Sequence, residues 1–161
     1  MKIGINREYL VRHLFVTVLM VGLAGWFGFD GFVRYPQTDA AALYESIERD
    51  APPPGMTSAE LQRFKEQKTG FQRMFALALL LVGAVVGVRL LKSARFSMSF
   101  DGDGFVVDGT RYSYVDIKGV EDAEWAKKGI ARVLVKDRKI VLDAWHHTGV
   151  KDFYEKIKNP R

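Results

Sequence analysis

Few residues in this chain of 161 could do chemistry, since it holds three histidines and no cysteine. Asp143, His146 and His147 lie close together in the sequence, and carboxylate and imidazole groups are ligands for zinc or iron. The two histidines are adjacent, so in a regular element they point in different directions and lack the i, i+4 spacing of a chelating pair. We therefore predict surface or capping roles for them and no metal site, with a metal-dependent enzyme as the weaker alternative.

The acidic stretch from Asp101 to Gly104 raises the question of a calcium site. An EF-hand loop starting at Asp101 would need glycine at its sixth position and glutamate at its twelfth, but Val106 and Tyr112 stand there. Asp-Gly between alternating apolar runs predicts a β-hairpin instead. The sequence also has no P-loop, dinucleotide-binding glycine motif, catalytic serine motif or H-E-x-x-H motif. It therefore predicts a non-catalytic protein without a cofactor.

Two apolar runs, Leu14 to Phe29 and Met74 to Val88, contain no charged side chain. Each is a little shorter than the ~20 residues that cross a bilayer core, and apolar flanks extend both. A signal peptide is the alternative for the first run, but the run exceeds the usual apolar region and no A-x-A-like cleavage site follows it. The sequence therefore predicts a membrane protein with a two-helix transmembrane hairpin.

The basic residues beside the two apolar runs predict the orientation of the hairpin. Residues 30–73 hold six basic and seven acidic side chains, a net charge of −1. The basic residues that flank the runs on their other sides are Lys2, Arg7, Arg12, Arg89, Lys92 and Arg95. Because cytoplasmic segments carry the excess of Lys and Arg, both termini are expected in the cytoplasm of a multi-pass inner (plasma) membrane protein.

Four segments are expected on this basis. They are an N-terminal segment with the first transmembrane helix (1–33), an extracytoplasmic loop with short helices (34–70), a second transmembrane helix (71–91) and a cytoplasmic domain (92–161). In the loop, Asp39 can cap a helix, and Thr57 and Glu60 have the spacing of a capping box. These helices are interpreted as interfacial, with a partner-binding site as the alternative. Residues 92–161 are expected to be soluble and mostly β when expressed alone.

Small residues within the apolar runs have the four-residue spacing that lets helix backbones approach closely. They are Gly83 and Gly87 in the second run and Ala24 and Gly28 in the first. We interpret them as packing the two helices against each other within the chain, with self-association or docking into a larger assembly as the alternative.

From Arg95 onward the apolar period changes from helical to twofold, which predicts antiparallel strands with short turns. The expected strands are Phe96–Phe100, Phe105–Val107, Thr110–Tyr114, Ile117–Trp125, Ala131–Lys136 and Lys139–Ala144. Thr148 is expected to cap a C-terminal helix with one buried stripe. The stripe consists of Val150, Phe153, Tyr154 and Ile157. The predicted fold class is therefore α+β, with a helical hairpin followed by an antiparallel sheet that the C-terminal helix caps.

This order of strands and final helix resembles the pleckstrin-homology-like (PH-like) domains of bacterial membrane proteins. The residues that carry the likeness, within 95–158, are Asp103–Val107, Tyr112–Glu121, Val133–Val135 and Lys139–Leu142. The resemblance implies a partial barrel that binds proteins or rests on lipid. Six strands are expected where the family typically has seven, so one is missing or formed by the linker after Leu91. Phosphoinositide-binding members use basic residues in the first hairpin; because Asp101 and Asp103 occupy it here, that activity is not carried over.

The net charge of +5 does not predict a nucleic-acid partner, because fourteen basic residues alternate with eleven acidic ones in residues 92–161. The mild surplus suits an anionic membrane surface. Candidate lipid contacts are Lys127, Lys128, Lys136, Arg138 and Lys139, although lysine at hairpin tips also protects strand edges. The predicted function is a membrane-anchored interaction or assembly module that binds an unidentified protein or lies on anionic lipid. An accessory subunit of a larger membrane complex is the alternative.

Overall fold

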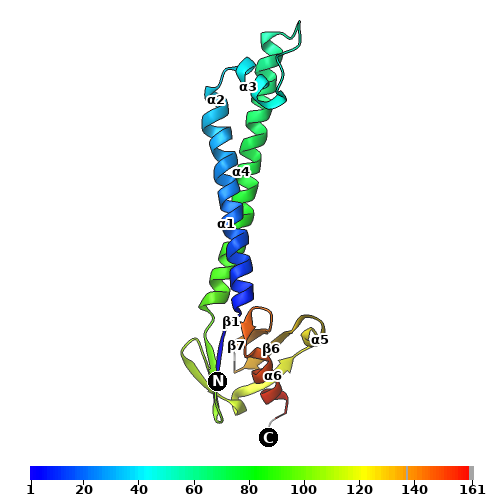
Figure 1. The fold of residues 1–161 in the computed structure, drawn as a ribbon. Helices are drawn as coiled ribbons and strands as arrows, with labels where there is room; N and C mark the ends of the chain where they lie inside the picture. The colour runs from blue at the N-terminus through cyan, green and yellow to red at the C-terminus, as the bar shows by residue number, and fades with distance from the viewer. Residues whose placement is uncertain (137, 160–161) are drawn as a thin grey trace. The chain divides into compact units, whose positions relative to one another are not determined.

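The computed structural model describes residues 1–136 and 138–159. The chain is α+β, with two long apolar helices and antiparallel sheets (Figure 1). It divides into two compact units, one formed by Met1–Leu14 together with Val88–Arg161 and the other by Phe15–Gly87. The first residues of the chain therefore belong with its C-terminal part, although the sequence-based segments placed them with the first helix.

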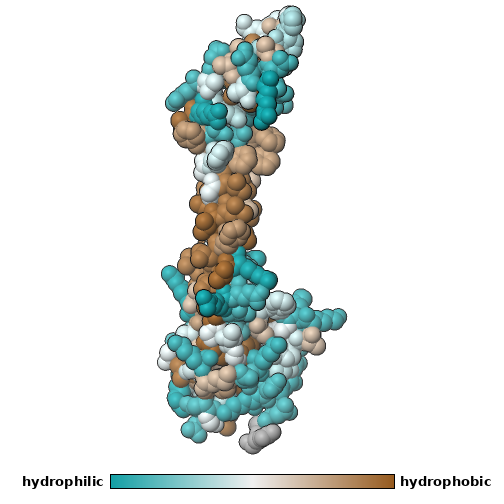
Figure 2. Space-filling model, in the orientation of Figure 1, coloured by the Kyte–Doolittle hydropathy of each residue, from teal (hydrophilic) through white to brown (hydrophobic). Residues whose placement is uncertain are grey.

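The unit Phe15–Gly87 holds most of the two long helices. Helix α1 (Arg7–Phe29) continues through a π-helical turn (Asp30–Arg34) into α2 (Tyr35–Gln37). Helix α4 (Ser58–Arg95) is continuous, and both helical stretches are long and apolar enough to cross a membrane. Figure 2 shows hydrophobic residues gathered along them, and most of these side chains are exposed. Two helices that are apolar all round cannot bury that surface in each other.

Gly83 and Gly87 of α4 lie where α4 packs against α1. A Cβ atom added at Gly83 would lie 3.2 Å from Cβ of Met20, and one at Gly87 would lie 3.4 Å from Cγ2 of Thr17. Such short distances leave no room for a larger side chain without movement. The two glycines therefore serve the approach of the helices within the chain.

The small residues of α1 lie along the same pair of helices. A Cβ atom added at Gly28 would lie 3.8 Å from Cβ of Ala76, and both Ala24 and Ala76 are buried. The approach is closest at Gly31, where an added Cβ would lie 2.9 Å from the backbone nitrogen of Arg73. Arg73 also donates a hydrogen bond of 2.8 Å to the Gly31 carbonyl, which fixes the end of the helix pair.

The segment between the long helices contains α3 (Ala40–Glu48) and is capped as predicted. The Asp39 carboxylate accepts hydrogen bonds from the backbone nitrogens of Ala41 and Ala42. Glu60 accepts a hydrogen bond from the Thr57 backbone nitrogen at 2.7 Å, and Thr57 Oγ1 accepts one from Glu60 in return at 3.3 Å. This reciprocal pair is the predicted capping box, and α4 begins there.

The β-rich unit is built from two antiparallel sheets. Within the described residues, one sheet has the strand order β4-β3-β2-β1-β8 and the other has the order β5-β6-β7. The strands are β1 (Lys2–Ile5), β2 (Met98–Phe100), β3 (Gly104–Val107), β4 (Thr110–Ser113), β5 (Ile117–Glu121), β6 (Ile130–Val135), β7 (Arg138–Asp143) and β8 (His147–Thr148). The strands predicted from the alternating pattern lie within a few residues of β2 to β7.

Strand β1 comes from the N-terminus and lies inside the first sheet. It pairs antiparallel with β2, where Ile3 faces Met98, and with β8, where Ile5 faces His147. The Ile3 side chain is only 1% exposed, and its cluster includes Phe105 of the neighbouring strands. In the described residues the sheets thus contain β1 and β8 besides the six predicted strands, and β1 comes from residues that precede the first long helix, whereas the segment after Leu91 is still helical.

Helix α6 (Val150–Lys158) packs its apolar stripe on this core. The ring of Phe153 lies 5.3 Å from that of Phe100 and 5.2 Å from that of Phe105. The predicted cap at Thr148 is wrong, because this residue pairs in β8 and its hydroxyl donates to the Gly4 carbonyl. Gly149 begins the helix instead, with φ of 79°, a left-handed conformation that glycine adopts without strain.

The predicted strand Ile117–Trp125 is too long, because β5 ends at Glu121 and Trp125 begins a short helix, α5 (Trp125–Lys128). Two contacts with α6 account for the difference. The Trp125 ring stacks on Tyr154 at 3.9 Å, and the Tyr154 hydroxyl donates to the Asp122 carboxylate at 2.7 Å. The turn after the strand therefore closes over the helix rather than extending the sheet.

Candidate functional site at the base of the helices

The first turns of α1 (Arg7–Leu14) and the last turns of α4 (Val88–Arg95) belong to the β-rich unit and are called the helix base below. His13 lies in the helix base, and His146 of the β7–β8 loop and His147 of β8 lie against it. The ring of Tyr9 lies 4.0 Å from the ring of His13 and 4.2 Å from that of His146. Two of the three histidines, 133 positions apart in the sequence, therefore pack against one tyrosine in tilted ring contacts.

Backbone and side-chain hydrogen bonds join this column to the loop between β7 and β8. The Asn6 backbone nitrogen donates to the His146 carbonyl at 2.7 Å. Ser93 Oγ of α4 lies 3.5 Å from Nδ1 of His146, and the Ser93 carbonyl lies 3.0 Å from Nε2 of His147. The helix base is thus connected to the sheet through His146 of the loop and His147 of β8.

The three candidate metal ligands do not converge on one point, because Asp143 and His146 lie together whereas Nε2 of His147 faces the Ser93 carbonyl. His147 is buried, and because its Nε2 faces a carbonyl it must donate there. Its ring packs on Phe96 at 4.8 Å, whereas His146 faces Tyr9 and Asp143. Among residues 1–136 and 138–159 there is no group of three or more histidine, cysteine or acidic side chains that could hold a metal ion. The metal hypothesis therefore has no geometric support.

Ser93, His146 and Asp143 also invite comparison with a hydrolase triad, and the geometry argues against it. Asp143 Oδ2 lies 3.3 Å from Nδ1 of His146, and Ser93 Oγ lies 3.5 Å from the same nitrogen. A triad needs the acid and the nucleophile on opposite nitrogens of the imidazole, so that one orients the ring while the other loses its proton. Here both compete for one position, and the serine is buried.

Burial, more than the neighbouring charges, favours the neutral form of His146. Burial lowers the pKa of His146 below its ordinary value, and the neighbouring His147, His13 and Arg89 lower it further. Asp143 acts in the opposite direction by raising the pKa. Protonation of His146 would therefore add a positive charge near Arg89, and Asp143 is the carboxylate that opposes this effect.

Trp145 is the most conspicuous exposed side chain beside this column. It is 70% exposed, and the turn that presents it is fixed by Asp143, which accepts hydrogen bonds from the backbone nitrogens of Trp145 and His146 at 2.9 and 3.1 Å. A small cavity of about 100 Å³ separates it from α1. The lining residues are Asn6, Glu8, Tyr9, Arg12, His13 and Trp145.

The five basic residues predicted to contact lipid fall into two groups at opposite ends of the β6–β7 hairpin. Lys127 and Lys128 lie in α5, just before Ile130 of β6, and the other three lie at or beside the turn after Val135. Four of the five form ion pairs: Lys128 with Glu124, Lys136 with Asp116, Arg138 with Asp108 and Lys139 with Glu121. The hairpin turn therefore offers little uncompensated positive charge.

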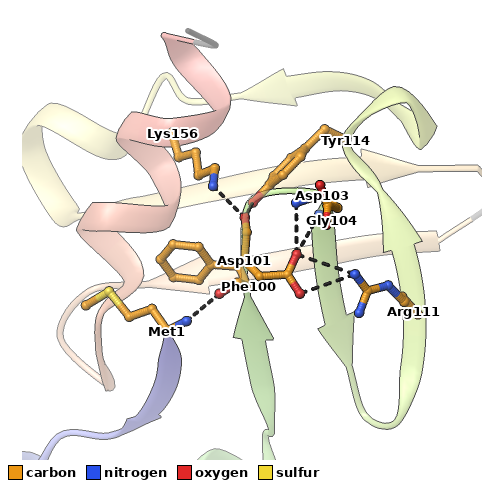
Figure 3. A network of polar contacts seen from close by, with 8 residues as sticks. All are labelled: Met1, Phe100, Asp101, Asp103, Gly104, Arg111, Tyr114 and Lys156. Atoms are coloured by element: carbon orange, nitrogen blue, oxygen red, sulfur yellow. Dashed lines mark hydrogen bonds and ion pairs between the residues drawn. The ribbon is translucent and has the colours of Figure 1, made fainter.

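The acidic loop that first raised the question of calcium is satisfied within the protein (Figure 3). The Asp101 carboxylate accepts hydrogen bonds from the backbone nitrogens of Asp103 and Gly104 and pairs with Arg111 at 3.2 Å. These backbone donors, with Arg111, lower the pKa of Asp101. Lys156 of α6 donates to the Asp101 carbonyl, which closes the loop against the helix. The loop is a turn, as the sequence predicts.

Comparison with known proteins gives no match: no family model, no curated protein and no solved structure is similar to this chain. The likeness to PH-like domains therefore stays a prediction from the sequence. The function has to be inferred from the position and chemistry of the residues described above.

Proposed function

We propose that the chain is a non-catalytic interaction or assembly module of the inner membrane. In this proposal α1 and α4 cross the bilayer as a hairpin, and the β-rich unit is a PH-like domain in the cytoplasm that binds a protein or lies on lipid. Both ends of the hairpin and both termini are then on the cytoplasmic side.

The pairing of β1 with β2 is the observation that carries this proposal. Strand β1 directly precedes α1, and β2 directly follows α4. Since the two strands share one sheet, with Lys2 opposite Ser99, the chain must return to the side from which it left. A single crossing would separate the strands, whereas two crossings keep them together. This supports a hairpin without using any charge rule.

The distribution of basic residues supports the cytoplasmic side. Arg7 and Arg12 lie in the first turns of α1, and Arg89, Lys92 and Arg95 lie in the last turns of α4. All five lie in the ranges Met1–Leu14 and Val88–Arg161, which form the β-rich unit. The basic end of the hairpin is therefore the end that carries the sheet, and basic ends are favoured on the cytoplasmic side.

A binding role is favoured over catalysis or transport, because the polar side chains that could serve catalysis make structural hydrogen bonds and the apolar runs contain no ionisable side chain. The residues that resemble a metal site or a triad are engaged in structural hydrogen bonds, as described above. The apolar runs of α1 and α4 carry no ionisable side chain that would mark a transport path, and two helices cannot enclose one. The strand order and the position of α6 support a PH-like scaffold.

Single-cysteine labelling tests the proposal, because the chain has no cysteine of its own. Ala51→Cys places a thiol in the segment between the long helices, and Val115→Cys places one on the β-rich unit, where Val115 is 89% exposed. A membrane-impermeant maleimide should label Ala51→Cys in right-side-out vesicles and Val115→Cys in inside-out vesicles. Labelling of both variants from the same face would contradict the hairpin.

Membership of a larger membrane complex is the second candidate, favoured by the apolar surface that the helices leave exposed. The small-residue faces are already occupied within the chain, so a partner would have to use other faces. Trp26 and Phe29 are exposed on α1 and are suitable contacts. Extraction in mild detergent followed by size analysis separates the candidates, because a stoichiometric subunit would migrate only with its complex.

A further inference from the structure

Trp145 poses a question that the proposed function leaves open, because a large aromatic side chain is held in water on a firmly hydrogen-bonded turn. We propose that Trp145 and the neighbouring helix α5 form a contact with phospholipid headgroups, by which the β-rich unit rests on the bilayer that its own helices cross. This inference rests on the proposed function, because it assumes that α1 and α4 are in the membrane.

The level of Trp145 along α1 agrees with headgroup depth. The indole lines the same cavity as Tyr9 and Arg12, and the apolar run of α1 begins at Leu14. Leu14 is five positions after Tyr9, which is about 7.5 Å along a helix axis. The headgroup region on each side of a bilayer is roughly 5 to 7 Å thick. Trp145 therefore lies about one headgroup layer from the start of the hydrocarbon.

The chemistry of the surrounding residues fits an interface between lipid and water. Tryptophan is enriched there because its ring is apolar while its N–H needs a polar partner. A second cavity, of about 580 Å³, lies between Trp145 and α5. Its lining includes Trp125, Lys127, Lys128 and Lys151. Lysines beside an exposed tryptophan can donate to headgroup phosphates while the indole ring lies among the headgroups.

The other basic group of the domain is excluded from this surface by the strand register. In β6, Ile130 pairs with Asp143 near Trp145, whereas Val135 pairs with Arg138 at the far end. The two ends are separated by about 17 Å along the strand. Lys136, Arg138 and Lys139 lie at the far end, and it is this position that excludes them, because Lys128 is also paired with an acid, Glu124. Of the five predicted lipid contacts, the inference therefore retains Lys127 and Lys128.

Fluorescence quenching by brominated lipids tests the contact in the full chain. One variant keeps Trp145 alone (Trp26→Phe with Trp125→Phe), and a second keeps Trp26 alone (Trp125→Phe with Trp145→Phe). The matched control carries Val115→Trp in a chain without other tryptophans. This control is suitable because Val115 is also highly exposed but precedes Ile117, which pairs with Val135 at the far end of the sheet. Circular dichroism verifies that each variant is folded.

The variants are reconstituted in phosphatidylcholine–phosphatidylglycerol vesicles whose acyl chains carry bromine either near the headgroup or deep in the bilayer. We expect Trp145 to be quenched several-fold more strongly than the Val115→Trp control by the shallow bromine, and Trp26 to be quenched most strongly by the deep bromine. If Trp26 is quenched while Trp145 resembles the control, the headgroup contact is wrong and the hairpin stands. If Trp26 is not quenched, the proposed function itself fails.

Discussion

Replacing Ile3 by alanine tests the role of β1 in the β-rich unit. The Ile3 side chain is 1% exposed and lies opposite Met98, which is equally buried. Truncating such a side chain to alanine removes buried methyl groups and leaves a cavity, at a cost of about 2–5 kcal/mol. We expect a loss near the middle of that range, about 3 kcal/mol, from a domain whose total stability is about 5–15 kcal/mol.

The matched control is Val115→Ala, which also truncates a β-branched side chain. Val115 is 89% exposed, so its loss should change the free energy of unfolding by less than about 0.5 kcal/mol. Urea titration of both variants in detergent, monitored by tryptophan fluorescence, measures the difference in their free energies of unfolding. Trp125, which stacks on Tyr154, reports on the β-rich unit. Equal midpoints for the two variants would refute the reasoning that β1 is part of the core.

A larger perturbation separates the β-rich unit from the hairpin. A chain of residues 92–161 lacks β1, which leaves β2 and β8 without their shared neighbour. Extending the register in which Ile3 faces Met98 places Ile5 opposite Phe96, so a two-residue Asn-Gly turn can join these residues directly. The joined chain keeps every strand and omits the apolar helices.

We expect the joined chain to be soluble and to unfold cooperatively, and residues 92–161 alone to aggregate or to lack a cooperative transition. Far-ultraviolet circular dichroism during urea unfolding measures both. This expectation replaces the sequence-based one, in which residues 92–161 suffice. A cooperative transition with the same midpoint in the two chains would show that β1 contributes nothing.

Three further predictions concern the helix base, the helix pair and the outer segment. The pKa of His146 in the folded chain lies below the ordinary 6.5, so the unfolded chain binds the proton at a higher pH than the folded chain does. The contribution of neutral His146 to the free energy of unfolding is therefore complete above about pH 6.5 and is lost as the pH falls toward the lowered pKa. The thermal midpoint should therefore fall on acidification, and His146→Asn should flatten the dependence. Gly83→Val should destabilise the helix pair by about 1–3 kcal/mol, because its Cβ would lie 3.2 Å from Cβ of Met20. Gly22→Val is the control, since an added Cβ there has nothing within 4 Å, and thermal unfolding in detergent compares the two variants. Asp39→Ala should cost about 1 kcal/mol and increase amide exchange in α3, since its carboxylate caps that helix, and unchanged exchange would contradict the cap.

The apolar pattern sufficed to predict most of the regular elements. Alternation predicted β2 to β7, and the caps at Asp39 and Thr57 were correct because capping depends on neighbouring residues alone. The positive-φ turn at Asp108 and Gly109 follows from the same local chemistry. These features are local, so the sequence contains the whole physical argument for them.

The remaining features depend on contacts between distant parts of the chain. Strand β1 has only four residues with two alternating isoleucines, which is too short a pattern to predict a strand beside a long apolar run. Its partner β2 begins at Met98, far away in the sequence, so the pairing cannot be read from neighbouring residues. Thr148 was expected to cap α6 because of its position just before the helix. Its pairing with Gly4 in the sheet is a contact between distant residues that no local rule predicts.

The candidate site was hidden for the same reason. Nothing in the spacing of His13 and His146 indicates that both pack against Tyr9, because that contact requires β1 to lie beside β8. Likewise, the basic residues of the β6–β7 turn appear in the sequence as a positive cluster, and their acidic partners come from other segments of the chain.

Disulfide trapping in the membrane is the most direct test of the claim that the residue stretches before α1 and after α4 share one sheet. Lys2 lies opposite Ser99, and paired positions of antiparallel strands have Cα separations of about 4.5–5.5 Å, which a disulfide can bridge. In a chain without other cysteines, Lys2→Cys with Ser99→Cys should form an intramolecular disulfide in isolated membranes, whereas Lys2→Cys with Val115→Cys should not. Failure of the first pair to form a disulfide, with its two thiols labelled from opposite faces of the membrane, would contradict the account.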